Sequence, residues 1–136
     1  MIAMARRRLK QAVGRRVAEY GLSAQQFWVL VHLEEADGPG LGAVCETLRM
    51  DAPTASRAVT QLLRRKLVKA EGDRGDRRRL RLRLTPTGRG RMPPLRALAA
   101  ELRGAAVHGL GADEENALRT LLRKVIANLD KLIGAP

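Results

Sequence analysis

The sequence predicts a mainly α-helical fold that carries one small β-hairpin. Apolar residues recur at three- and four-residue spacing along most of the 136 residues, as in helices packed on a common core. One stretch, Leu80 to Leu84, instead alternates leucine with arginine, the two-residue period of a strand with one buried face. Aromatic residues make up only 2% of the chain, so aliphatic side chains must build the core.

Four helices are expected before the hairpin. The first runs from about residue 3 to residue 19, before Gly21, and the second opens at Ser23 with Gln26 as its capping-box partner. The loop 37–40, with two glycines and a proline, ends the second helix, and a short third helix covers 41–48. Pro53 is expected at the first position of the fourth helix, which runs to about Lys66.

The second half begins with the hairpin. A strand over 67–71, a tip over 72–79 and the return strand 80–84 predict two antiparallel strands around a turn rich in Gly and Asp. The alternate leucines of the return strand are expected to be buried, so Arg81 and Arg83 should face solvent or phosphate. Thr85 caps the next helix with Pro86 at its first position, and Asp113 is expected to cap the last helix.

The last helix is apolar along one whole side. Its stripe consists of Leu118, Leu121, Leu122, Val125, Ile126, Leu129, Leu132 and Ile133. A small chain has little surface with which to cover such a stripe, so the pattern favours a dimer.

Positive charge is concentrated in one part of the chain. Lys and Arg number 26 against 14 Asp and Glu, and residues 57–91 alone hold 13 cations and three anions. A focused basic block on ordered structure indicates an anionic partner, because solvated surfaces usually mix both signs. The order of short helix, turn, polar-faced helix and basic hairpin then predicts a winged helix-turn-helix that binds double-stranded DNA.

The DNA contacts follow from the dimensions of the grooves. A helix enters the major groove, and a thin hairpin tipped with arginine reaches the adjacent minor groove. The outward side chains of the fourth helix are the candidate DNA contacts: Thr54, Ser56, Arg57, Thr60, Gln61 and Arg64. Arg77 and Arg78 are expected at the tip of the wing.

Residues 21–88 resemble the MarR (multiple-antibiotic-resistance regulator) family of bacterial transcription factors. The match is most specific from Asp73 to Arg78, followed by Leu82, Leu84, Thr85 and Gly88. The resemblance implies a homodimer that places two recognition helices about one DNA turn, roughly 34–36 Å, apart on a pseudo-palindromic operator. It also implies a repressor released by a small effector, and it makes Asp76 the acid that orients Arg78 in the wing.

The resemblance divides the chain into three parts. Residues 1–20 and 89–136 are expected to dimerise, and residues 21–88 to bind DNA. Arg49 and Lys66 stand where the family often has glycine at turns, and Ala70 replaces a frequent arginine. Two prolines, 93 and 94, fall inside the fifth helix, where they favour a kink or a break.

Several residues keep two interpretations. Cys45 is expected to pack in the core, with a redox switch as the alternative. Tyr20, Trp28 and His32 could line an effector pocket, or be ordinary core or interface residues. Arg6 to Arg8 form either a DNA-contacting arm or a solvated helix face.

Other classes of function fit the sequence less well. No phosphate loop, nucleophile motif, paired carboxylate or metal-ligand spacing occurs, so neither an enzyme nor a cofactor or metal site is expected. The longest apolar run has five residues, 27–31, and no signal peptide precedes it, so a cytoplasmic protein is expected. A non-specific architectural DNA binder and an RNA-binding winged domain remain as alternatives.

Overall fold

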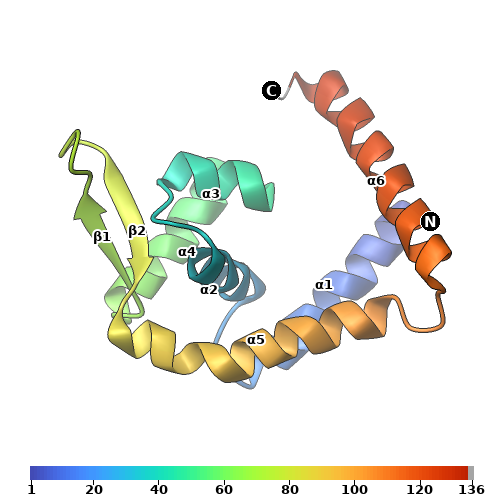
Figure 1. The fold of residues 1–136 in the computed structure, drawn as a ribbon, viewed down its shortest axis with the longest axis horizontal. Coiled ribbons are helices and arrows are strands. Elements are labelled where there is room, and N and C mark those ends of the chain that lie inside the picture. The colour runs from blue at the N-terminus through green and yellow to red at the C-terminus, as the bar shows by residue number, and fades with distance from the viewer. Residues whose placement is uncertain (135–136) are drawn as a thin grey trace. The chain divides into compact units, whose positions relative to one another are not determined.

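The computed structural model describes residues 1–134 and confirms a mainly helical fold with one hairpin (Figure 1). Its elements in chain order are α1 (Ile2–Ala18), α2 (Ala24–Glu35), α3 (Leu41–Leu48), α4 (Ala52–Arg64), β1 (Val68–Gly72), β2 (Leu80–Leu84), α5 (Pro86–Ala106) and α6 (Ala112–Ile133). The backbone forms two compact units, one covering residues 1–102 and the other beginning at Arg103.

The core of the first unit is aliphatic and centres on α2. This helix contacts α1, α3, α4 and β2, and it buries residues on most of its circumference. The largest fully buried side chains of the unit are Phe27, Leu30, Leu62, Met92 and Leu95. Leu98 and Leu102 of α5 also lie in this core.

Side chains cap the helices of the first unit largely as predicted. The Ser23 hydroxyl accepts a hydrogen bond from the Gln26 amide at 3.1 Å, and the Gln26 side-chain oxygen accepts one from the Ser23 amide at 3.2 Å. The expected position of Pro53 was wrong by one residue. Asp51 is the cap, accepting from the Thr54 amide at 2.8 Å, so Pro53 occupies the second helical position.

Helix α6 also begins earlier than expected. Its cap is Gly111, whose amide donates to the Glu114 carboxylate at 3.0 Å, so the expectation that Asp113 caps the helix was wrong. Asp113 lies in the first turn instead, where a carboxylate still interacts favourably with the helix dipole. In α6, all of whose residues are described, no side chain is fully buried.

The two strands pair in antiparallel register from Val68 opposite Leu84 to Gly72 opposite Leu80. Leu82 and Leu84 are buried, as the alternation predicts. Leu80 is 57% exposed, so the prediction that every leucine of this strand is buried was wrong. The physical reason is that Leu80 lies at the last paired position before the turn, opposite Gly72, which has no side chain to cover it.

The two prolines of α5 do not break the helix. Pro93 and Pro94 lie inside a helix that continues to Ala106, and Figure 1 shows it as one curved element. Both prolines are exposed, whereas Met92 and Leu95 beside them are buried. The apolar contacts of these neighbours offset the loss of the helical hydrogen bonds that proline cannot donate.

Lys66 and Arg49 adopt the left-handed backbone conformation, with φ of 58° and 54°. We expect Lys66→Gly to raise the free energy of unfolding by about 0.5–1 kcal/mol, because glycine adopts this conformation without the steric cost of a Cβ. Chemical denaturation measures the change. Lys66→Ala removes the same charge but keeps the Cβ, so it should not stabilise the protein, and an equal gain in both variants would contradict the backbone explanation.

Candidate DNA interface

Helix α4 presents a polar face beside a packed one. Its buried residues are Ala55, Ala58, Val59 and Leu62, and they hold the helix against α2 and α3. Of the six predicted contact residues, five are exposed and Thr54 is half-buried: Ser56, Arg57, Thr60, Gln61 and Arg64 lie on the outer face. The turn from α3 into α4 passes through the left-handed Arg49, so α3, turn and α4 form a helix-turn-helix.

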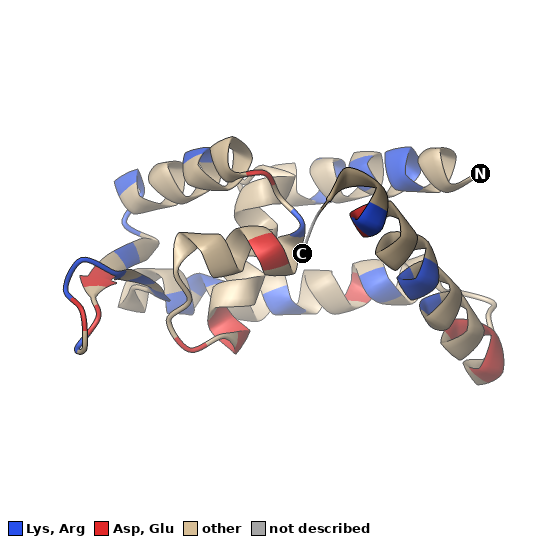
Figure 2. Ribbon diagram, turned by 90° about the horizontal axis from the view of Figure 1, so that it is seen from above, with Lys and Arg blue, Asp and Glu red and all other residues tan. Residues whose placement is uncertain are grey.

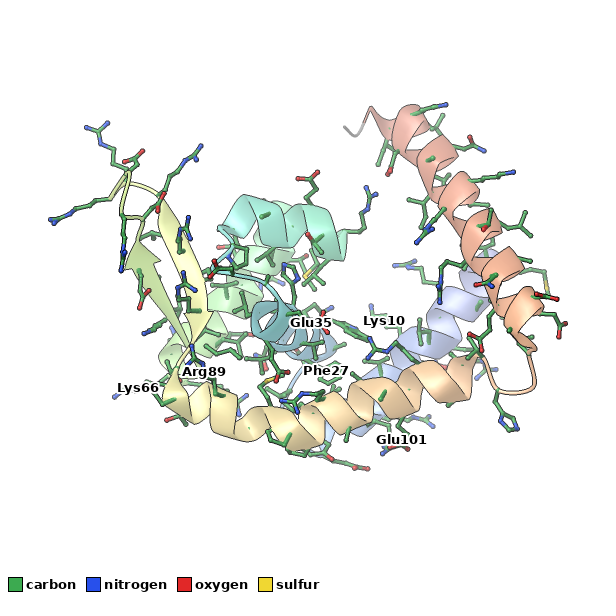
Figure 3. All side chains as sticks on the ribbon, in the orientation of Figure 1. Lys10, Phe27, Glu35, Lys66, Arg89 and Glu101 are labelled. Atoms are coloured by element: carbon green, nitrogen blue, oxygen red, sulfur yellow. The ribbon has the colours of Figure 1, made fainter. Side chains whose placement is uncertain are left out.

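The hairpin next to α4 carries most of its charge at the turn. Figure 2 shows Lys and Arg along this turn, with a few acids between them. In Figure 3, long side chains ending in nitrogen project outward from it. A thin, positively charged projection beside a polar helix has the dimensions and charge to contact the minor groove.

The cations on the two strands of the hairpin, which we call its root, form ion pairs, whereas those in its tip, residues 72–79, form none within the described part of the chain. At the root Lys69 pairs with Glu71 at 2.7 Å, Arg81 pairs with Asp73 at 3.1 Å, and Arg83 pairs with Asp37 at 2.8 Å. Arg81 and Arg83 remain partly exposed, at 41% and 31% of the side chain, so they face solvent as predicted, but each also pairs with a carboxylate.

The tip arginines make no ion pair with any described residue, and all four are exposed: Arg74, Arg77, Arg78 and Arg79. The Asp76 carboxylate accepts a hydrogen bond from the Arg78 backbone amide at 3.0 Å, and the Asp76 carbonyl accepts one from the Arg79 amide at 3.0 Å. Asp76 thus shapes the turn that presents Arg77 and Arg78, and its carboxylate binds the backbone of Arg78 rather than the guanidinium.

A buried glutamine ties one predicted contact residue to the core. Gln26 is only 8% exposed, and its side-chain amide donates to the Gln61 side-chain oxygen at 2.7 Å. Arg65 donates to the Gly21 carbonyl at 2.7 Å and to the Gln26 oxygen at 3.5 Å. Gln61 therefore keeps both of its NH₂ donors for a ligand. The capping-box pattern found Gln26, but no local signal indicates its contact with α4.

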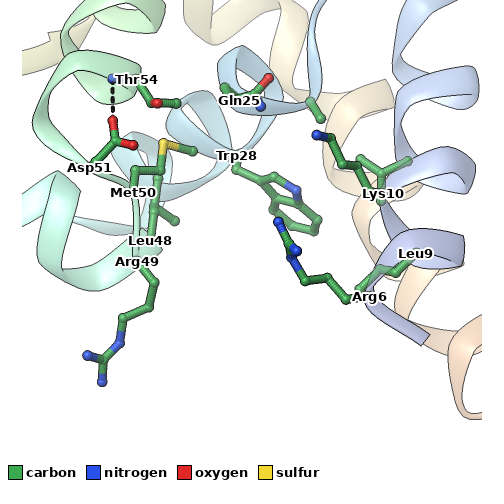
Figure 4. A pocket seen from close by; sticks show the side chains of 12 residues that line it. Arg6, Leu9, Lys10, Gln25, Trp28, Leu48, Arg49, Met50, Asp51 and Thr54 are labelled. Carbon is green, nitrogen blue, oxygen red and sulfur yellow. Dashed lines mark hydrogen bonds between the residues drawn. The ribbon is translucent and has the colours of Figure 1, made fainter. Parts of the chain in front are cut away.

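A cavity of about 470 Å³ lies between α1, α2 and the α3–α4 turn (Figure 4). Trp28 lines it, together with the cations Arg6, Lys10 and Arg49. Its complete lining is Arg6, Leu9, Lys10, Val13, Ala24, Gln25, Trp28, Leu48, Arg49, Met50, Asp51 and Thr54.

The other two predicted effector residues lie outside this cavity lining. Tyr20 packs against the core, and its carbonyl accepts a hydrogen bond from Arg91 at 2.6 Å. The buried Nε2 atom of His32 has no hydrogen-bond partner among the described residues. Only Trp28 of the predicted trio lines the cavity.

Residues 1–134 contain no cluster of three or more His, Cys, Asp and Glu side chains that could bind a metal ion. Cys45 is a half-buried free thiol on α3. No helix in the described part of the chain has the length and hydropathy needed to cross a bilayer.

Comparison with known proteins gives a consistent result. The model of the MarR family matches residues 20–79. A probable transcriptional regulator from Pseudomonas aeruginosa is 30% identical, with 92% of this chain and 96% of that chain covered and a TM-score of 0.75. No curated protein matched the sequence.

Two further solved structures relate the fold to DNA and to a ligand. Bordetella bronchiseptica BpsR, whose DNA binding is regulated by 6-hydroxynicotinic acid, is 28% identical over 91% of this chain and 89% of that chain, with a TM-score of 0.81. A mutant of Escherichia coli MarR in complex with operator DNA is 23% identical over 91% and 89% of the two chains, with a TM-score of 0.79, and shows the same fold.

Proposed function

Because this chain belongs to the MarR family of transcriptional regulators, we propose that it is a cytoplasmic repressor that binds a pseudo-palindromic operator as a homodimer and is released by a small effector. Family members are regulators of transcription rather than enzymes. The observation that carries the proposal is the combination of a polar α4 face with a tip of unpaired arginines on one hairpin.

In this proposal α4 occupies the major groove and the hairpin tip occupies the minor groove beside it. Ser56 and Arg57 lie near the start of α4, the end of a recognition helix that reaches base edges. Thr54 in the first turn of α4 contacts a base or phosphate there, and Thr60, Gln61 and Arg64 do so further along the helix. Asp76 holds the turn of the hairpin, and Arg77 and Arg78 enter the minor groove. The NH₂ donors left free on Gln61 suit phosphate oxygens or guanine acceptors.

In this proposal, different parts of the chain bind DNA and form the dimer. Residues 21–88 bind DNA, and residues 1–20 and 89–136 form the dimer, of which residues 135 and 136 lie outside the described part. Exposed apolar side chains on both terminal helices support this division, among them Met4 and Leu9 on α1 and Leu121 and Leu129 on α6. A second copy would cover these faces.

The experiment that tests the proposal is selection of a duplex from random DNA with the full protein, followed by binding measurements on that duplex. A repressor should prefer it to unrelated DNA by roughly 10³ or more. An architectural binder would select no sequence, and an RNA-binding domain would be displaced more readily by RNA than by DNA. Either of these outcomes would reject the proposal.

Within this experiment, Arg78→Ala should weaken binding by about tenfold or more and reduce the slope of log affinity against log salt by about one for each protomer, so by about two for the proposed homodimer. The reason is the loss of one arginine from the unpaired tip, where it is free to neutralise DNA charge. The control is Arg119→Ala, which removes the same charge from an exposed site on α6 that is not among the proposed DNA contacts. Equal affinities for the two variants would show that the wing tip does not contact DNA.

The cavity beside Trp28 suits an aromatic anion as the effector. An aromatic ring can stack on the indole, and a carboxylate can pair with Arg6 or Lys10 at the rim. Trp28 is the only tryptophan, so its fluorescence reports on the cavity directly. Aromatic carboxylates are expected to quench it and to weaken DNA binding, whereas the matching neutral amides should do neither; equal quenching by acids and amides would contradict an anion site.

A further inference from the structure

We propose that Arg83 is a positioning residue, which fixes the hairpin against the loop between α2 and α3 and thereby sets the direction of the arginine tip. Arg83 need not touch DNA in this role. Its effect on DNA binding rests on the function proposed above, but its effect on the hairpin does not.

Arg83 joins three segments of the chain through one guanidinium. It lies on β2, and its Nη1 donates to Oδ1 of Asp37 in the loop after α2 at 2.8 Å. Its Nε lies 3.3 Å from Oε2 of Glu71 on β1. The hydrogen bond from Arg83 holds the pKa of the Asp37 carboxyl below its ordinary value, so the pair stays ionised well into the acid range.

The loop is shaped to receive this side chain. A Cβ added at Gly38 would lie 2.8 Å from Nη2 and 2.9 Å from Cζ of Arg83, and Gly38 itself is buried with φ of +58°. The guanidinium therefore rests directly on the glycine backbone. On the neighbouring residue of β2, the Leu82 amide donates to the Pro39 carbonyl at 2.9 Å. A backbone bond and an ion pair thus join the hairpin to the loop at adjacent positions.

Two-stranded hairpins are marginally stable by themselves, so their orientation depends on such external contacts. Arg81, two residues before Arg83 on β2, pairs with Asp73 of the same hairpin. Its ion pair stays within the hairpin and does not tie it to the helices. The two arginines thus share strand and charge but differ in the segment that they bind.

Hydrogen exchange of the Leu82 amide in the full protein tests the proposal without DNA. Arg83→Met, which keeps an apolar stem, should speed this exchange by about fivefold, the range of one well-placed surface ion pair. Arg81→Met should leave the rate within about twofold of the wild type, and Arg83→Lys should restore part of the protection. Equal rates in Arg83→Met and Arg81→Met would overturn the assignment.

Binding of the selected duplex supplies a second test, whose sign distinguishes positioning from simple electrostatics. Asp37→Ala and Glu35→Ala each remove one negative charge from exposed sites two residues apart, and Glu35 forms no ion pair with any described residue. Charge alone predicts unchanged or tighter binding for both. Positioning predicts that Asp37→Ala binds about threefold more weakly, whereas Glu35→Ala does not.

The outcomes separate the two proposals. If the wild type selects no duplex, the repressor assignment fails and the exchange rates alone decide the role of Arg83. If it selects a duplex and Asp37→Ala binds as tightly as Glu35→Ala, the positioning role is overturned.

Discussion

Replacement of Gly88 by alanine should lower the free energy of unfolding by about 3 kcal/mol or more, since it forces a methyl group into fixed backbone. The added Cβ would lie 2.1 Å from the Leu67 carbonyl oxygen and 3.0 Å from its carbon. That carbonyl cannot move aside freely, because it accepts a hydrogen bond from the Thr85 amide at 3.0 Å. The Thr85 hydroxyl in turn donates to the Lys66 carbonyl at 2.7 Å and accepts from the Gly88 amide at 3.0 Å.

Gly90→Ala, two residues further along α5, is the matched control. A Cβ added there meets no described atom within 4 Å, and alanine favours a helix over glycine by up to about 1 kcal/mol. The control should therefore be as stable as the wild type or more stable, and denaturant midpoints measure both variants. Similar losses in the two would show that α5 disfavours alanine generally and that the contact with Leu67 is not the cause.

Gly88 illustrates which part of the fold local sequence can predict. The resemblance identified the residue, and Thr85 with Pro86 marked the start of the helix. The reason for glycine is a carbonyl 21 residues upstream, which no local pattern specifies. Elements with strong local signals, such as α3 and β2, have the predicted bounds, whereas the caps at Asp51 and Gly111 differ because several nearby residues can cap a helix.

The sequence could predict which face of each strand or helix in the candidate site is packed and which is exposed. Leu82 and Leu84 had to be buried, so Arg81 and Arg83 had to lie on the other face. Their partners were not predictable, since Asp37 lies 46 residues before Arg83 and reaches it only through the fold. Because Arg81 and Arg83 already pair with carboxylates, the net charge overstates how many cations of the hairpin can neutralise DNA phosphates.

Sequence spacing also could not show whether the three candidate effector residues line one cavity. Trp28 and His32 are one turn apart on α2, which places them on one face of an isolated helix. Helix α2 is surrounded on most sides by α1, α3, α4 and β2, so one turn along it leads from the cavity into packed protein. The residues that do accompany Trp28, Arg6 and Lys10, come from α1, and their spacing carried no signal of a shared site.

Leu129→Glu is expected to dissociate the proposed dimer and to weaken operator binding by on the order of 100-fold or more. Leu129 is 51% exposed and lies in the apolar stripe of α6, beside Ile126 at 43% and Leu122 at 40%. A two-fold interface would contain the substitution twice, and each carboxylate would be buried without a partner. A loss of about 3 kcal/mol or more in dimer stability follows, which is more than 100-fold in the dimer dissociation constant.

Ala127→Glu introduces the same charge at an exposed position two residues away, about 200° around the helix from Leu129 and on the side opposite the apolar stripe. It should leave the dimer intact, so sedimentation velocity at low protein concentration should separate the two variants. Because one head contacts half an operator, a Leu129→Glu monomer should still bind a half-site weakly, and its salt slope should fall by about half. If the monomer bound the whole operator as tightly as the wild type does, the apolar face of α6 would not be needed to hold two DNA-binding regions together.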